Sequence, residues 1–301
     1  MATFNGAEHL PAQLQSLKDQ SHGNWELVVS DDGSADGTVE IVRRFSSGIP
    51  QRVTIVEGPQ KGFWQNFLSL LRRTNGTEVE GDLFACCDQD DIWFDDKLQR
   101  AIEWFRKQPS KAPAVYFSRT QLMSEDGRIT GLSFPFGRPT GFQNALVQSI
   151  GGGNTMVLNR AAKSLLARAP ADIILVSHDW WTYQVVTGAG GQAFFDQEPT
   201  LKYRQHGNNL VGANRGVRAR LVRLRAFMGG RARRWNDTNI TSLNQMRTLL
   251  SDSALRTLDL FSSARTAPFL KRISLLRRSG VYRQGRLETL GLYLGTWLGL
   301  I

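Results

Sequence analysis

A short apolar run followed at once by three carboxylates limits the folds open to this chain more than any other feature. Residues Leu83-Phe84-Ala85-Cys86-Cys87 are continuously hydrophobic, and Asp88-Gln89-Asp90-Asp91 follows them directly. A continuous apolar run without alternation is typical of a strand covered on both faces, as in a parallel sheet. In an open α/β sheet, ligands bind beyond the carboxyl ends of the strands. The pattern therefore predicts a buried parallel strand that ends in a ligand site.

The acidic cluster also indicates a cation. Three carboxylates within four residues repel one another unless a cation or hydrogen-bond donors compensate their charge. Mg²⁺ or Mn²⁺ takes oxygen ligands from one or two carboxylates and completes its shell with phosphate and water. A bare Asp-x-Asp is also a common cap, here for a helix that carries Leu98, Ile102 and Phe105. The neighbouring motifs decide between these two interpretations.

The residues before this cluster alternate between strand-like and helix-like patterns. Strands are expected over 25–30 and 53–56, with amphipathic helices before, between and after them. The first of these strands ends in Asp31-Asp32-Gly33-Ser34, which places a second carboxylate pair at a strand end. Asp and Gly are ordinary turn residues, but a turn alone does not require carboxylates at two strand ends. The order of elements predicts the α/β class, with a doubly wound, mostly parallel sheet.

Charge divides the chain into two parts. Residues 215–301 carry 17 Lys+Arg against 4 Asp+Glu, whereas residues 1–214 carry 20 against 23. We therefore expect a catalytic domain over 1–214 and a basic helical region over 215–301. The two cysteines are adjacent in the predicted strand and form no disulfide or zinc pattern, which favours a reducing, cytoplasmic compartment.

Seven segments together resemble the family 2 glycosyltransferases with the nucleotide-sugar-binding A-type fold, and among them the bacterial rhamnosyltransferase-like members. They occur in the family's order and span the first two-thirds of the chain. The matching segments are Ala2-Thr3-Phe4-Asn5-Gly6, Asp31-Asp32-Gly33-Ser34, Gly62 with Asn66-Phe67, Asp88-Gln89-Asp90-Asp91-Ile92-Trp93, Gly152-Gly153-Asn154-Thr155, His178-Asp179-Trp180-Trp181 and Tyr203-Arg204-Gln205-His206-Gly207.

The resemblance implies an inverting transfer of a sugar, rhamnose above all, from a dTDP- or UDP-linked donor to a saccharide or lipid-linked acceptor. Such a transfer needs the nucleotide held, the leaving diphosphate neutralised and the acceptor hydroxyl deprotonated. By resemblance, Thr3 and Asp32 contact the nucleobase, Asp31 supports the turn, Asp88 reaches the ribose and Asp90 ligates Mg²⁺ or Mn²⁺. Gly62 belongs to the donor site on the same grounds.

The acceptor side is assigned to the later motifs. By resemblance Asp179 is the catalytic base, with Asn154 also on this side, and Trp180 and Trp181 offer aromatic faces on which a sugar ring can pack. An N-cap Asp on a helix whose tryptophans face the core is the alternative, and for the tryptophans it is equally supported.

Two residues of the last motif complete the donor site. Arg204 is expected to clamp the diphosphate, unless it pairs with a structural carboxylate. His206 is expected to bind the metal or to donate to the diphosphate.

The tail has a different character. Arginines alternate with apolar residues over 215–228, a pattern typical of a basic helix on an anionic membrane surface. A helix packed on the catalytic domain is the plainer alternative. The apolar stretch Leu287–Ile301 is too short to span a bilayer, so it lies on the membrane or covers another helix. Together these features predict a peripheral protein at the inner face of the cell membrane. We expect no nucleic acid partner, since no recognisable module for one is present.

Two other classes of protein share part of this pattern. A nucleotidyltransferase that makes a sugar nucleotide shares the sheet and the acidic site but should carry a Gly-rich phosphate loop with Lys or Arg near residue 3. A non-catalytic nucleotide-binding module would not need the motifs at Asp179 and His206. Finally, only Met1 and Ala2 precede Thr3, and two residues cannot form a central strand of ordinary length. We therefore expect several further apolar residues before Met1, and unpaired backbone groups beside Leu27–Ser30.

Overall fold

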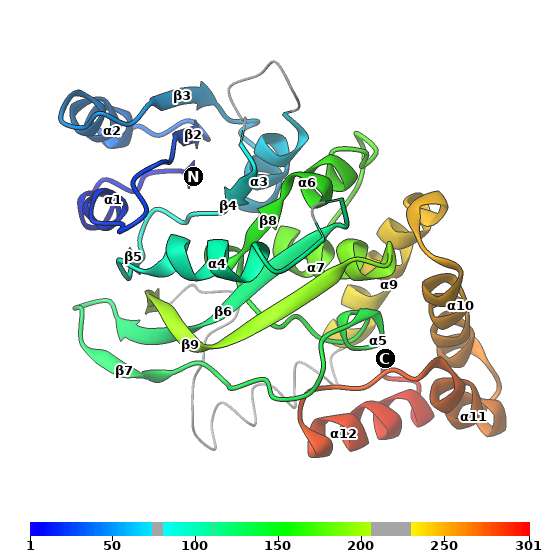
Figure 1. Cartoon of the computed structure of the whole chain (residues 1–301). Coiled ribbons are helices and arrows are strands. Elements are labelled where there is room, and N and C mark those ends of the chain that lie inside the picture. The colour runs from blue at the N-terminus through cyan, green and yellow to red at the C-terminus, as the bar shows by residue number, and fades with distance from the viewer. Residues whose placement is uncertain (74–80, 110, 206–229) are drawn as a thin grey trace. The chain divides into compact units, whose positions relative to one another are not determined.

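The computed structural model (Figure 1) describes residues 1–73, 81–109, 111–205 and 230–301. The chain forms two compact units. Unit 1 comprises Met1–Pro135, Gly151–Arg168 and Phe194–Val211, and unit 2 comprises Phe136–Ile150, Ala169–Ala193 and Gly212–Ile301. The predicted boundary between 214 and 215 lies outside the described residues.

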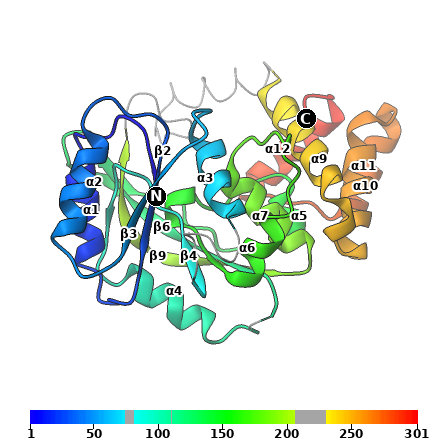
Figure 2. The same cartoon turned by 90° about the horizontal axis from the view of Figure 1, so that it is seen from above.

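Unit 1 begins with a parallel sheet of order β1-β2-β3, formed by β1 (Ala2–Thr3), β2 (Leu27–Asp31) and β3 (Val53–Glu57). Helices α1 (Leu10–Lys18) and α2 (Thr38–Ser47) lie on one side of it, and α3 (Phe63–Arg72) lies on the other (Figure 2). Helix α1 buries Leu10, Leu14 and Leu17 against β2, which forms the core of this half. The predicted doubly wound parallel arrangement is confirmed here.

A second sheet, with antiparallel strand pairs, completes unit 1. Its order is β4-β8-β6-β9-β5, with β7 paired to β6. The strands are β4 (Leu83–Ala85), β5 (Ile92–Trp93), β6 (Ala114–Ser124), β7 (Ile129–Leu132), β8 (Val157–Asn159) and β9 (Gln192–Gln205). Helices α4 (Lys97–Phe105) and α6 (Arg160–Leu166) and the short 3₁₀ turn η1 (Gly153–Thr155) accompany it.

The direction of β4 corrects one prediction. The apolar run 83–87 was expected to be a parallel strand, but β4 covers only Leu83–Ala85 and pairs antiparallel with β8. Leu83–Ala85 are partly buried, and Cys86 and Cys87 are buried, but burial alone does not specify the direction of the neighbouring strand. Cys86 and Cys87 are buried thiols, as expected.

The first strand is short, as the sequence indicates. Ala2 pairs with Ser30 and Thr3 with Asp31, and the amino group of Met1 donates to the Val28 carbonyl at 2.7 Å. The carbonyl of Val28 is therefore not unpaired, contrary to expectation. The expectation of further residues before Met1 stays a prediction.

Unit 2 is helical. Helices α5 (Phe142–Ala145) and α7 (His178–Gly188) belong to it. The chain then runs through α9 (Arg231–Gln245), η2 (Arg247–Leu249), α10 (Asp252–Thr266), α11 (Phe269–Ser279) and α12 (Arg286–Trp297). This confirms the predicted helical C-terminal region for residues 230–301. Among the described residues, no helix is long and apolar enough to cross a lipid bilayer.

Candidate active site

The first carboxylate pair organises the turn after β2. Asp31 accepts hydrogen bonds from the hydroxyl of Thr3 at 2.7 Å and from the backbone N–H of Ser34 at 2.8 Å. The Ser34 hydroxyl also donates to it at 2.6 Å. Parallel register places Thr3 beside Asp31, so the end of β1 and the turn after β2 form one rigid edge. Asp31 thus supports the turn, as the sequence predicts.

Asp32 fastens the loop between β3 and α3. Its two carboxylate oxygens accept the backbone N–H groups of Gln60 at 2.7 Å and of Gly62 at 2.9 Å. The loop approaches so closely that a Cβ at Gly58 would lie 2.6 Å from Asp32 Oδ1. Gly62 has φ +95°, which glycine adopts without strain, and it precedes α3 directly. Thr3, Asp31, Asp32 and Gly62 are thus brought together at this edge of the sheet.

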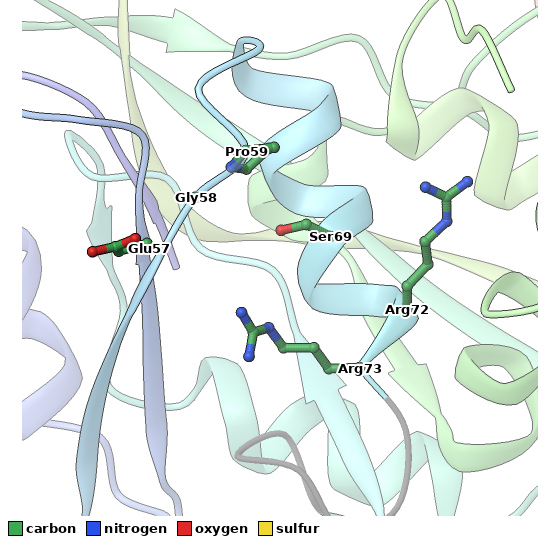
Figure 3. Close-up of a pocket in the computed structure, with 6 residues that line it drawn as sticks. All are labelled: Glu57, Gly58, Pro59, Ser69, Arg72 and Arg73. Carbon is green, nitrogen blue, oxygen red and sulfur yellow. The ribbon is translucent and has the colours of Figure 1, made fainter. Parts of the chain in front are cut away.

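A pocket of about 440 Å³ opens beyond this loop, between the end of β3 and the last turn of α3. Figure 3 shows its six lining residues: Glu57, Gly58, Pro59, Ser69, Arg72 and Arg73. Burial lowers the pKa of Arg72. None of the residues predicted from the sequence to act in the site lines this pocket.

The second acidic cluster has the arrangement that a divalent ion requires. Asp88, Asp90 and Asp91 each offer a carboxylate oxygen, and these atoms lie within 4.8 Å of one another. Asp88 and Asp90 are half-buried, whereas Asp91 is fully buried. Hard cations such as Mg²⁺ and Mn²⁺ prefer an all-oxygen set of this kind. The residues present therefore fit the metal that the sequence predicts.

The two acidic segments are tied together through Gln89. Its side-chain amide accepts the N–H of Phe4 at 2.8 Å and donates to the Phe4 carbonyl at 3.0 Å. Gly6 leaves room for this amide, since a Cβ there would come within 2.3 Å of it. Asn5 accepts the N–H of Ala35 at 2.9 Å, on the turn that follows Asp31. Residues 3–6 thus join the two acidic segments. The part that Gln89 plays in this connection was not predicted from the sequence.

Asp91 anchors the acidic turn in the interior. Its oxygens accept the backbone N–H of Arg204 at 3.1 Å and the amide of Asn154 at 2.5 Å. Burial raises the pKa of Asp91, and the neighbouring charge of Asp90 raises it further. In the sequence, Asp91 stands out only as part of the acidic run. The structure assigns it to holding the turn that carries Asp88 and Asp90.

Lys97 lies fully buried beneath the same turn. Its ammonium donates to the carbonyl of Asn154 at 3.1 Å and lies 4.6 Å from the ring centroid of Trp93. Burial lowers the pKa of Lys97 to about 8, although Cys87 and Asp91 act in the opposite direction. Nothing in the sequence distinguishes Lys97 from a solvated residue in the first turn of a helix.

Arg204, at the end of β9, lies against the acidic turn. Its guanidinium donates from Nε to the carbonyl of Asp90 at 3.1 Å and from Nη1 to the carbonyl of Glu125 at 2.8 Å. It was expected either to clamp a diphosphate or to pair with a structural carboxylate. Two of its side-chain bonds go to carbonyl oxygens, one of them that of Asp90, and both expected roles stay predictions. His206, the other predicted residue of this motif, lies outside the described residues.

Asn154, predicted to bind the acceptor, is buried. Its side chain donates to Asp91 and its carbonyl accepts from Lys97. These contacts favour support of the acidic turn, and an acceptor contact stays a prediction.

The remaining predicted residues belong to unit 2, at the start of α7. Asp179 accepts the N–H of Trp180 at 2.6 Å and the hydroxyl of Ser177. The indole of Trp180 donates to the Ala145 carbonyl at 2.7 Å, and Trp181 is fully buried. Burial lowers the pKa of His178. The two indoles therefore pack in the interior, which favours the core alternative, and their role as a sugar-stacking surface stays a prediction.

Comparison with known proteins agrees with this arrangement. The model of glycosyl transferase family 2 matches residues 1–166. The chain is 29% identical over 238 residues to "dTDP-rhamnosyl transferase RfbG" of Shigella flexneri, covering 74% of this chain and 78% of that protein. It is 25% identical over 214 residues to "Putative teichuronic acid biosynthesis glycosyltransferase TuaG" of Bacillus subtilis, covering 71% and 80%.

A solved structure shares the fold. The mannosyltransferase PcManGT from Pyrobaculum calidifontis, determined in complex with GDP-Man and Mn²⁺, aligns with a TM-score of 0.51 at 18% identity. The alignment covers 99% of this chain and 84% of that one. Since the family model matches more than half of the 301 residues, the chain belongs to glycosyl transferase family 2 and is a glycosyltransferase with the A-type fold.

Proposed function

We propose that the protein transfers rhamnose from dTDP-rhamnose to a saccharide or lipid-linked saccharide in the synthesis of a bacterial surface polysaccharide, with inversion and with a divalent metal. The observation that carries this proposal is the acidic turn 88–91, joined through Gln89 to the segment that holds Thr3 and Asp31. This arrangement supports a cation-binding group beside groups suited to a nucleoside. The name of the Shigella relative supports the choice of dTDP-rhamnose.

The donor is held by unit 1 in this proposal. Thr3 and Asp32 contact the nucleobase, Asp88 contacts the ribose, and Gly62 brings the α3 loop close to the nucleotide. Asp90 holds Mg²⁺ or Mn²⁺, with His206 as a further ligand. When bound, the metal neutralises the charge of the leaving diphosphate. Arg204 contributes positive charge beside Asp90.

The transfer is a single displacement. The acceptor oxygen forms a bond to the anomeric carbon, the bond from that carbon to the diphosphate oxygen breaks, and the nucleoside diphosphate leaves with the electron pair. Asp179 accepts the proton of the acceptor hydroxyl as the bond forms. We place the reaction at an anionic membrane surface on the cytoplasmic side, because a lipid-linked acceptor is confined to a membrane and the chain has a net charge of +10.

Release of nucleoside diphosphate tests the proposal. The protein is incubated with an acceptor extract and with dTDP-rhamnose, UDP-sugars or GDP-sugars in turn, in Mn²⁺, in Mg²⁺ and in EDTA. We expect dTDP release from dTDP-rhamnose, dependent on metal. Release of diphosphate, or of a different nucleoside diphosphate alone, would correct the reaction or the donor.

The metal site is tested with Asp90→Ala. This variant should lose transfer and Mn²⁺-dependent donor binding by orders of magnitude, because it removes a proposed ligand. Asp82→Ala is the matched control, since Asp82 is an exposed carboxylate in a surface pair with Arg160. Full transfer in EDTA, or by Asp90→Ala, would contradict a metal held at Asp90.

A further inference from the structure

An apolar helix face turned toward solvent occurs in unit 2. Helix α12 buries one side through Leu292, Gly295 and Thr296. Its opposite side is exposed, and the leucines there follow at spacings of three and four along 287–298. Together with two residues of α11 they form what we call the α11–α12 apolar face: Phe269, Leu270, Leu287, Leu290, Leu294, Trp297 and Leu298.

This face is more exposed than apolar residues usually are on the surface of a soluble protein. Leu270 is 89% exposed and Leu287 is 82% exposed, and the other members are between 39% and 65% exposed. Single exposed apolar residues are common, but a contiguous set marks an interaction site. The face is continuous across the two helices, because the rings of Phe269 and Trp297 lie 4.8 Å apart. Figure 1 shows α11 and α12 next to each other at the C-terminal end of the chain.

The charges around the face indicate its partner. Residues 268–301 hold one acidic side chain, Glu288, which pairs with Arg283 at 3.3 Å. Six basic side chains occur in the same stretch: Lys271, Arg272, Arg277, Arg278, Arg283 and Arg286.

A basic side chain also lies on the exposed side of α11. Arg277 follows Leu270 by seven residues, so the two lie on the same side of α11, and both are exposed. Leucine and tryptophan flanked by arginine fit the boundary between acyl chains and anionic headgroups.

From this arrangement we infer that the α11–α12 apolar face inserts into the surface of an anionic lipid bilayer. The inference deepens the proposed function, because it names the surface through which the enzyme would meet a lipid-linked acceptor. It does not depend on the basic segment 215–228, to which the sequence pointed first. The helix lies in the plane of the membrane, since α12 has 12 residues and a span needs about 20.

Vesicle cosedimentation of the full chain tests the inference. Vesicles of phosphatidylcholine alone are compared with vesicles that also contain phosphatidylglycerol. The variant Leu290→Ser/Leu294→Ser should weaken binding roughly 30-fold, if each leucine contributes about half of its full burial free energy to membrane binding. The control Ile129→Ser/Ile174→Ser also removes two exposed aliphatic side chains, neither of them from α11 or α12, and should bind as the parent does.

A second pair of variants tests the charge. Arg277→Gln and Arg278→Gln should each weaken binding to the anionic vesicles roughly fivefold, with no effect on phosphatidylcholine alone. Unchanged vesicle binding by the double leucine variant would overturn the inference. So would a parent dimer that this variant converts to monomer, since the face would then be occupied by a second copy.

The outcome is separable from the proposed function. The double leucine variant should retain Mn²⁺-dependent binding of dTDP-rhamnose, because neither leucine belongs to the donor site. If the parent protein did not bind dTDP-rhamnose, the proposed function would be rejected, but the vesicle result would still hold.

Discussion

The buried carboxylate of Asp91 allows a stability prediction that separates hydrogen bonding from charge. Replacing it by Ala leaves the N–H of Arg204 and the amide of Asn154 without their acceptor, in a part of unit 1 closed to water. Each unsatisfied buried donor costs about 1–3 kcal/mol. Burial also disfavours the ionised carboxylate, as the raised pKa of Asp91 indicates. Removing the carboxylate therefore offsets part of the free energy lost with the two hydrogen bonds. We therefore expect Asp91→Ala to lower the free energy of unfolding by about 3 kcal/mol, in the lower half of the summed range.

The corresponding change in melting temperature follows from the size of the chain. Unfolding entropy is about 2.1 cal/mol/K per residue near 60 °C, which for this chain gives about 0.6 kcal/mol/K and a Tm lower by about 5 °C. The measurement is urea and thermal unfolding in EDTA, followed by circular dichroism, so that no metal contributes to stability.

Asp91→Asn is the matched control for this experiment. Its side-chain oxygen still accepts from Arg204, and Asn154 can exchange its amide oxygen and nitrogen by a half-turn to meet the new amide. Both hydrogen bonds are then kept, and the cost should stay within about 1 kcal/mol. If Asp91→Asn were as destabilising as Asp91→Ala, charge rather than hydrogen bonding would anchor the turn. A cost below about 1 kcal/mol for Asp91→Ala would refute the anchoring itself.

Two further predictions concern the proposed base and the buried ammonium. Asp179→Asn should lower kcat by orders of magnitude and leave the donor KM nearly unchanged, because it removes proton acceptance alone; an equal loss of donor affinity would identify Asp179 as structural. The folded-state pKa of Lys97 is about 8, below its ordinary value of 10.5, so the unfolded chain binds more protons between these values. Stability contributed by this residue should therefore rise as pH increases from 8 to 10.5, and Lys97→Met should remove that rise in urea unfolding measured across this range. The same pH dependence in parent and variant would contradict the assignment.

The order of elements and the two acidic segments could be predicted from the sequence because both depend on local patterns. Helix and strand periodicity depends on neighbouring residues, and Asp31 and Asp88 each come at the end of an apolar run that predicts a strand. Since ligand sites of α/β sheets form at strand ends, the proposed donor site rests on these segments and needs no coordinates to be predicted. The resemblance to family 2 glycosyltransferases rests on these same short segments.

The support beneath the acidic turn depended on contacts between distant segments. Asp91 meets Arg204 across 113 positions and Asn154 across 63, and Lys97 reaches Asn154 across 57. No local pattern encodes such pairs, because they follow from how β9 and η1 pack against the turn. For the same reason, a buried lysine could not be told from a solvated one.

Strand direction and helix exposure were likewise decided by tertiary structure. An apolar run is buried whether its neighbour is parallel or antiparallel, so the sequence did not specify that β4 pairs antiparallel with β8. Amphipathic periodicity shows that a helix has two faces but not which one other elements cover. In α12 the covered side holds Leu292, Gly295 and Thr296, while the leucine side faces solvent. Packing in unit 2 thus left the more hydrophobic side of α12 exposed.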